Sequence, residues 1–225
     1  MNNTVRDILK NSLLAAFGLF LFAFGVYLTI QADIGVAPWD AFNLGLSSTF
    51  GIKYGTASII VSFVIVVIDV LLREQIGIGM FLDAVLVGKS VDFFSWTGLV
   101  PKQEKLVFSL PVMAAGIFIM GFSQFLYMKA SLGCGPRDTL LVGLKRRAKK
   151  IPIGLISVCI LAVVTLAGYL LGGSIGIGTV ICALLTGPVM QLDFKIVKFD
   201  PTVLKHQNII ESFKIFALKF KIKAK

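Results

Sequence analysis

Two short segments of the chain carry a proline and an aspartate at the same spacing, and both could take part in binding a charged solute. The first reads GVAPWD, with Pro38 and Asp40, and the second reads GCGPRD, with Pro136 and Asp138. Proline fits the first position of a helix because its missing N–H group needs no partner there. An aspartate in the first turn faces the positive end of the helix dipole. Each segment is therefore predicted to begin a helix.

The two segments differ at the residue between the proline and the aspartate. Arg137 stands where the first segment has Trp39, which puts a cation in a first helical turn, where the dipole disfavours it. Either Asp138 compensates this charge, or a solute anion is held by the guanidinium together with the free N–H groups of the helix start. Gly35 and Gly133 are predicted to supply the preceding tight turns. The alternative is that both segments only cap helices.

Further candidates are charged residues in segments that are otherwise apolar. Charges inside a membrane are costly and usually face a partner or a water-filled cavity, so Asp83 and Lys89 are candidates for lining a solute pathway. Asp69, near the end of its helix, is expected to reach the membrane interface. The candidate substrate-binding residues are Trp39, Asp40, Asp83, Lys89, Arg137 and Asp138. The residues of the structural repeat motif are Gly35, Pro38, Gly77, Gly79, Gly133, Pro136, Gly176 and Gly178.

The composition indicates which elements must position these residues. The 225 residues are 56% hydrophobic and 15% charged, and no charged residue occurs in residues 11–32, 106–128 or 151–192. About 20 apolar residues cross a hydrocarbon layer of roughly 30 Å, so the third run is long enough for two crossings, with a turn at residues 172–174. The pattern predicts an all-α polytopic membrane protein. It excludes a soluble enzyme and a nucleic-acid-binding module, and it lacks the alternation of a β-barrel.

The chain also contains an internal duplication. Residues 32–46 match residues 130–144 at 6 of 15 positions, and residues 76–88 match residues 175–187 at 7 of 13 positions. We therefore predict two homologous membrane repeats of about 98 residues, at 1–98 and 99–195, followed by a basic amphipathic tail at 196–225. Each repeat has three long helices and one short half-helix that starts at the P-x-D segment.

The half-helices are predicted over Pro38 to about Phe50 and Pro136 to about Leu144. Thirteen residues rise about 20 Å, which is less than a membrane crossing. Half-helices at corresponding places of two repeats are the best sequence indication of a transporter binding site, and a re-entrant helix buried only for packing is the alternative. In the last helix of each repeat, Ala84 with Gly88 and Ala183 with Gly187 place small residues one turn apart, a pattern typical of close helix packing.

These segments resemble the YczE-like family of bacterial integral membrane proteins, which is related to the YitT group. The resemblance rests on the GVAPWD, GCGPRD and IGIG segments and extends from about Leu13 to Asp193. It implies a membrane-embedded bacterial protein without an agreed biochemical activity, in a family of which some members are linked to secondary-metabolite production. It transfers no catalytic or ligand-binding residue to this chain.

The basic residues predict which side of the membrane the loops face. Residues 145–150 and the tail from Lys195 hold 5 and 8 of the 22 basic residues, so both segments and the N-terminus are expected on the cytoplasmic side of the cell membrane. Six spans with inverted repeats and eight spans with parallel repeats satisfy this rule equally well. The short half-helices favour inversion, whereas Lys102 and Lys105, which inversion places outside, argue against it.

The function predicted from these features is a transporter, or a solute-binding membrane protein, for a small anionic or zwitterionic solute. The alternative is a non-transporting membrane protein that assists or regulates a biosynthetic or export complex. The sequence has no metal cluster, cofactor motif or catalytic constellation, so neither an enzyme nor a cofactor is expected. The expected partners are the lipid bilayer and the solute, and no nucleic acid. The apolar stripe over residues 209–220 predicts a helix on the cytoplasmic membrane surface.

Overall fold

The computed structural model describes residues 5–199, and the described part of the chain consists of helices joined by short turns. The helices are α1 (Val5–Gln31), α2 (Pro38–Phe50), α3 (Tyr54–Leu71), α4 (Ile78–Thr97), α5 (Leu106–Lys129), α6 (Pro136–Arg147), α7 (Ile153–Leu170) and α8 (Ile177–Ile196). The all-helical prediction is thereby confirmed for these residues. The predicted tail helix over residues 209–220 lies outside the described residues.

The two short helices begin where the prolines predict. Pro38 opens α2 and Pro136 opens α6, while Gly35 and Gly133 turn the preceding chain with φ angles of 99° and 115°. Residues that carry a side chain rarely adopt such φ angles, whereas glycine adopts them readily, so glycine permits both turns. The second helix extends to Arg147, three residues past its predicted end. At 13 and 12 residues, both helices rise less than 20 Å or so and are too short to cross a membrane.

Within residues 5–199, five helices are long and apolar enough to cross a membrane: α1, α3, α5, α7 and α8. The charge-free run 151–192 supplies the last two, with a turn at Gly172 as predicted. Helix α4 has 20 residues, but it carries Asp83, Lys89 and Asp92 and is not among the five. Large apolar side chains on the outside of the bundle are more than half exposed, as a lipid-facing surface requires, including Val158, Val163, Leu166 and Leu170 of α7.

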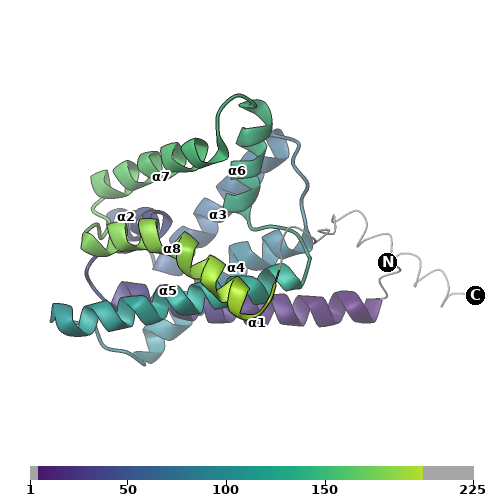
Figure 1. Cartoon of the computed structure of the whole chain (residues 1–225). Coiled ribbons are helices and arrows are strands. Elements are labelled where there is room, and N and C mark those ends of the chain that lie inside the picture. Colours follow the sequence, from purple (N-terminus) through teal and green to yellow (C-terminus); the bar gives the residue numbers. More distant parts are fainter. Residues whose placement is uncertain (1–4, 200–225) are drawn as a thin grey trace, which may run out of the picture.

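Helices α1 and α5 form the longest interface in the bundle and lie side by side along one edge of it (Figure 1). Glycines permit their close approach. A Cβ atom placed on Gly18 would lie 3.1 Å from the Cβ of Leu126, and one placed on Gly116 would lie 3.2 Å from the Cβ of Leu28. The contact moves backward along α5, from Leu126 to Gly116, as it moves forward along α1, from Gly18 to Leu28. The two helices are therefore antiparallel.

The segments before the half-helices are hydrogen-bonded to the starts of helices from the other half of the chain. The N–H of Gly178, in α8, donates to the carbonyl of Ile34 at 2.7 Å, and the N–H of Gly79, in α4, donates to the carbonyl of Leu132 at 2.9 Å. Helix α2 also packs on α7, and α6 packs on α3. These contacts bring the starts of both half-helices into the middle of the bundle.

Candidate functional site

A cavity of about 450 Å³ lies between the two halves of the chain, and it is bordered by the starts of both half-helices. Five of the six residues predicted to bind a solute line it: Trp39, Asp40, Asp83, Arg137 and Asp138. Lys89 is exposed on α4 and does not line the cavity. Of the two charged candidates on α4, the structure therefore brings only Asp83 to this site.

Asp40 is bound from two directions by residues outside its own helix. The residue is buried, with an exposed fraction of 2%. Its Oδ1 accepts a hydrogen bond of 2.8 Å from the hydroxyl of Tyr54 on α3. The same oxygen lies 3.9 Å from Nη1 of Arg137. The sequence predicts that Asp40 faces the dipole of α2 and takes part in solute binding. The structure adds a link from α2 to α3 and to α6.

Arg137 joins the two half-helices. Its guanidinium carbon lies 5.1 Å from the centre of the Trp39 ring, in a cation–π contact, while one nitrogen forms the ion pair with Asp40. Its side chain is 28% exposed and lines the cavity. The distance of 3.9 Å to Asp40 is beyond hydrogen-bond range, so the N–H groups of the guanidinium can also donate to a ligand in the cavity.

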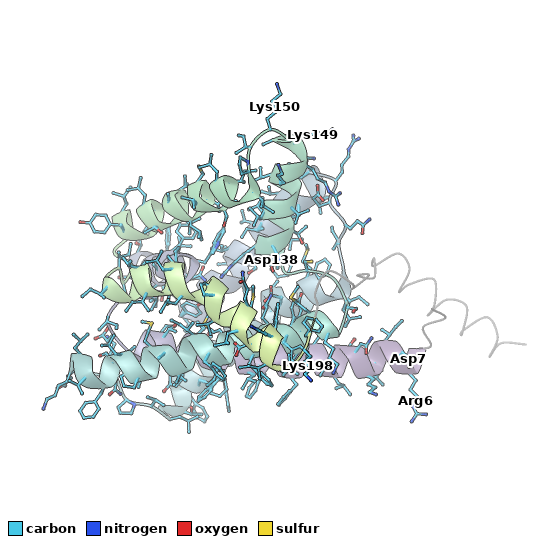
Figure 2. The ribbon with its side chains drawn as sticks, in the orientation of Figure 1. Arg6, Asp7, Asp138, Lys149, Lys150 and Lys198 are labelled. Atoms are coloured by element: carbon cyan, nitrogen blue, oxygen red, sulfur yellow. The ribbon has the colours of Figure 1, made fainter. Side chains whose placement is uncertain are left out.

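Asp83 and Asp138 bring two further carboxylates to the same wall. A Cβ atom placed on Gly135 would lie 2.5 Å from Oδ2 of Asp83 and 3.9 Å from Oδ2 of Asp138, so both groups approach one point at the start of α6. Asp138 is exposed to the cavity and lies in the middle of the molecule (Figure 2). Arg137 interacts electrostatically with both carboxylates.

Tyr127 is a site residue that the sequence analysis missed. It lies near the end of α5, lines the cavity and is 5% exposed, and its buried hydroxyl has no hydrogen-bond partner in the described part of the chain. A buried hydroxyl without a partner is unfavourable, so a ligand that supplies an acceptor would stabilise it. Gln124, one turn earlier on α5, lines the same cavity. The sequence signal that could have identified Tyr127 and Gln124 is that both are polar residues within an apolar run.

The charges of the lining residues bear on the kind of solute that fits. Three carboxylates, from Asp40, Asp83 and Asp138, face one guanidinium, from Arg137. A purely anionic solute, one of the two classes expected from the sequence, would meet an excess of negative charge. A solute with both charges would match the carboxylates at one end and the donors of Arg137 and Tyr127 at the other. Within residues 5–199, no three acidic, His or Cys side chains are grouped to hold a metal ion.

The far end of α6 is held by a separate ion-pair cluster, which the sequence did not predict. Glu74, in the α3–α4 turn, has a side chain that is only 4% exposed, and it lies 3.1 Å from Arg146 and 3.4 Å from Arg147. Arg147 also donates to the carbonyl of Leu72. Lys149 and Lys150 follow in the α6–α7 turn and point away from the bundle (Figure 2). The cluster therefore fixes the end of the half-helix that carries Arg137.

Comparison with known proteins places the chain in a family. A model for the DUF6198 family, described as a family of unknown function, matches residues 9–194. The chain belongs to the DUF6198 family. The match includes both half-helices and the lining residues of the cavity, and it stops before the basic tail. No solved structure matches the chain.

Three relatives of this DUF6198 protein support the resemblance found from the sequence motifs. It is 34% identical to the uncharacterized membrane protein YczE of Bacillus subtilis, over 77% of this chain and 80% of that protein. It is 28% identical to an uncharacterized protein of Haemophilus influenzae, over 83% and 84% of the two chains. It is 24% identical to the uncharacterized protein YyaS of Bacillus subtilis, over 84% and 92%. The expected likeness to YczE is thereby confirmed.

Proposed function

We propose that this protein is a membrane transporter that binds a small zwitterionic solute in the cavity between its half-helices. The proposal rests chiefly on one observation: the hydroxyl of Tyr127, which has no hydrogen-bond partner within residues 5–199, and the guanidinium of Arg137 line the cavity next to the carboxylates of Asp83 and Asp138. Mixed charges of this kind match an ammonium group and a carboxylate of one solute. The absence of a catalytic constellation among the lining groups favours binding and transport over catalysis.

Each lining residue has a role in this proposal. Asp83 and Asp138 bind the positively charged end of the solute, and Arg137 and Tyr127 donate hydrogen bonds to its acceptor end. Trp39 covers the guanidinium from one side and provides an apolar wall. Asp40 and Tyr54 are positioning residues, because their hydrogen bond holds the carboxylate that orients Arg137.

The proposal includes two inverted repeats, with six spans and with α2 and α6 as re-entrant half-helices. The antiparallel contact of α1 with α5 supports it, because equivalent helices of parallel repeats would cross the membrane in the same direction. The contacts of Gly18 with Leu126 and of Gly116 with Leu28 join positions that are related by the 98-residue offset of the duplication. In this arrangement α4 crosses the membrane with Asp83 facing the cavity, and both chain ends lie on the cytoplasmic side.

The ends of α1 and α5 support the same arrangement. The N–H of Gln103, before α5, donates to the carbonyl of Gln31 at the end of α1, at 2.8 Å. Lys102 lies 2.9 Å from Asp33 in the same region. Parallel repeats would place the end of α1 and the start of α5 on opposite sides of a hydrocarbon layer of about 30 Å, so these contacts favour inverted repeats. The ion pair also offsets the charge of Lys102, one of the two lysines that argued against inversion.

The experiment that tests the proposed function is thermal unfolding of the purified full-length protein with a panel of small solutes. The panel compares amino acids and betaines with amines and carboxylic acids of similar size. A zwitterion that binds is expected to stabilise the fold increasingly with its concentration, by about 2.7 kcal/mol at a hundred times its dissociation constant. Uptake of that solute into proteoliposomes then tests transport.

Matched variants separate the cavity from the rest of α4. Asp83→Asn removes a carboxylate from the cavity wall and is expected to abolish stabilisation by the solute. Lys89→Gln removes a charge from the exposed side of the same helix and is expected to leave that stabilisation unchanged. Failure of every zwitterion to stabilise the protein would reject the proposed site and favour the alternative of a non-transporting membrane protein.

A further inference from the structure

Helices α3 and α4 are tightly joined at two glycines, Gly55 and Gly88. A Cβ atom placed on Gly88 would lie 2.6 Å from the carbonyl oxygen of Gly55, so the two backbones are in direct contact. Across the same contact, Oδ1 of Asp92 on α4 accepts a hydrogen bond of 2.8 Å from the N–H of Gly55 on α3. We call this contact the α3–α4 seam. It closes the gap between the two helices at the start of α3.

The equivalent positions in the second half of the chain are open. Gly154 on α7 and Gly187 on α8 stand 99 positions after Gly55 and Gly88, and a Cβ atom placed on either would meet no atom of residues 5–199 within 4 Å. Gln191, at the position equivalent to Asp92, is exposed. We call this place the α7–α8 gap. The same pattern of small residues therefore gives two different packings in one molecule.

The gap opens directly beside the candidate site. Gly187 lines the cavity, together with Thr186 and Met190 of α8 and Ser157 of α7. Helix α7 packs mainly on the half-helices α2 and α6, whereas α3 packs extensively on α4. The α7–α8 gap therefore borders the cavity at Gly187, whereas the α3–α4 seam is closed at the corresponding place in the first half of the chain.

On the basis of the proposed function, we propose that the α7–α8 gap is one of two alternating entrances to the cavity. In the second conformation Gly154 packs against Gly187, as Gly55 now packs against Gly88, and α3 separates from α4. The side-chain oxygen of Gln191 then accepts a hydrogen bond from the N–H of Gly154, as Asp92 does from Gly55. Because α3 starts where α2 ends and α7 starts where α6 ends, the two entrances open toward opposite sides of the membrane in inverted repeats.

Two features of the chain make such an exchange physically reasonable. Small residues at both seams allow backbone contact on either side at similar cost, so the sequence does not commit the bundle to one closed seam. Packed helix interfaces tend to have discrete alternative arrangements, which makes a switch between two packings more favourable than a gradual deformation. The residue difference between Asp92 and Gln191 sets which seam is closed more of the time.

Disulfide cross-linking tests the second conformation without any solute. The native residues Cys134, Cys159 and Cys182 are replaced by serine, and the full-length protein with Gly154→Cys and Gly187→Cys is oxidised in native membranes. A cross-link is expected, because closing the gap brings the two Cα atoms within the 4.4–6.8 Å or so that a disulfide requires. The control combines Gly154→Cys with Leu185→Cys, since Leu185 is exposed on another side of α8. Cross-linking no greater than in this control would overturn the proposal.

A bulky residue at the gap provides a second test. Gly154→Trp fits the open space of the present conformation and is outside the cavity lining, so solute binding is expected to remain. Transport into proteoliposomes is expected to fall at least tenfold, because the indole prevents closure of the gap. Leu155→Trp, at an exposed neighbouring position, is expected to transport normally. Equal transport by the two variants would contradict the alternating entrances.

The two tests distinguish this inference from the proposed function. A protein that cross-links at the gap but binds no member of the solute panel would reject the zwitterion site and support the movement of α7 and α8. A protein that binds a zwitterion but never cross-links above the control would support the site and overturn the exchange of seams.

Discussion

Arg137 and Trp39 contact each other, with the guanidinium carbon 5.1 Å from the ring centre, although they occupy equivalent positions of the duplicated P-x-D segment. In the proposed arrangement of two repeats, equivalent residues meet only where the repeats face each other. The position at which the two segments differ is therefore also the position at which α2 and α6 meet. One aromatic and one cationic residue at this place form a cation–π contact. Two tryptophans or two arginines could not form a cation–π contact.

The first prediction concerns the ion pair behind this contact. Arg137→Gln leaves the buried carboxylate of Asp40 without its cation, and we expect it to destabilise the protein by about 1–3 kcal/mol. The measurement is the melting temperature in detergent without solute. A role in helix punctuation alone predicts no loss, because the change removes a cation from the unfavourable end of a helix dipole.

A double variant serves as the control for this prediction. Asp40→Asn together with Arg137→Gln removes both charges, so the loss of stability is expected to be smaller than the sum of the two single losses. Additive losses would show that the two groups, 3.9 Å apart, do not stabilise each other.

The second prediction concerns the hydrogen bond between Tyr54 and Asp40. Tyr54→Phe keeps the ring and removes the donor, and we expect it to lower the free energy of unfolding by about 1 kcal/mol. Tyr169→Phe is the matched control, because Tyr169 is 66% exposed on α7 and has no such bond. Equal melting temperatures for the two variants would show that this bond adds nothing to the fold.

The third prediction concerns the cluster at the end of α6. Glu74→Gln removes the charge that holds Arg146 and Arg147, so the last turn of α6 is expected to open more often. The rate of trypsin cleavage between Arg146 and Lys150 measures this opening, and we expect it to rise several-fold. Glu104→Gln, at an exposed position in the α4–α5 turn, is expected to leave the rate unchanged. A rate unaffected by Glu74→Gln would mean that backbone packing alone holds the end of α6.

The starts of the half-helices were predictable because they depend on local chemistry. Proline restricts its own φ angle and lacks a donor, so Pro38 and Pro136 both favour the first helical position. The turn near Gly172 was predictable as well, since a charge-free run of 42 residues is long enough for two helices. Membrane segments of this kind follow from length and polarity alone.

Side-chain direction was harder to predict. Asp83 and Lys89 are six positions apart, which is about 120° around a helix, so both cannot face one narrow cavity, and only the packing of α4 decides that Asp83 does. Asp69, near the end of α3, is fully buried among neighbouring helices, which the sequence did not predict, and its position at the membrane interface stays a prediction. Neither outcome is encoded within a single helix, because both depend on which neighbours pack there.

The difference between the two seams could not be predicted from the sequence. Ala84 with Gly88 and Ala183 with Gly187 have the same spacing, and this small-residue pattern predicts close packing for both α4 and α8. The structure shows that packing in the first half only. A sequence specifies which contacts are sterically allowed, whereas the contact that is occupied in one conformation depends on the balance of the whole bundle.

The last prediction concerns the sides of the membrane. Because the N–H of Gln103 is bonded to the carbonyl of Gln31, the start of α5 and the end of α1 lie on the same face. In the inverted arrangement this is the face opposite to Lys149 in the α6–α7 turn. Gln103 and Lys149 are replaced by cysteine, one at a time, in a full-length protein without native cysteines. Intact cells are then treated with a membrane-impermeant maleimide. We expect Gln103→Cys to be labelled from outside, and Lys149→Cys to be labelled only after the membrane is opened, whereas parallel repeats with eight spans predict that both are protected in intact cells.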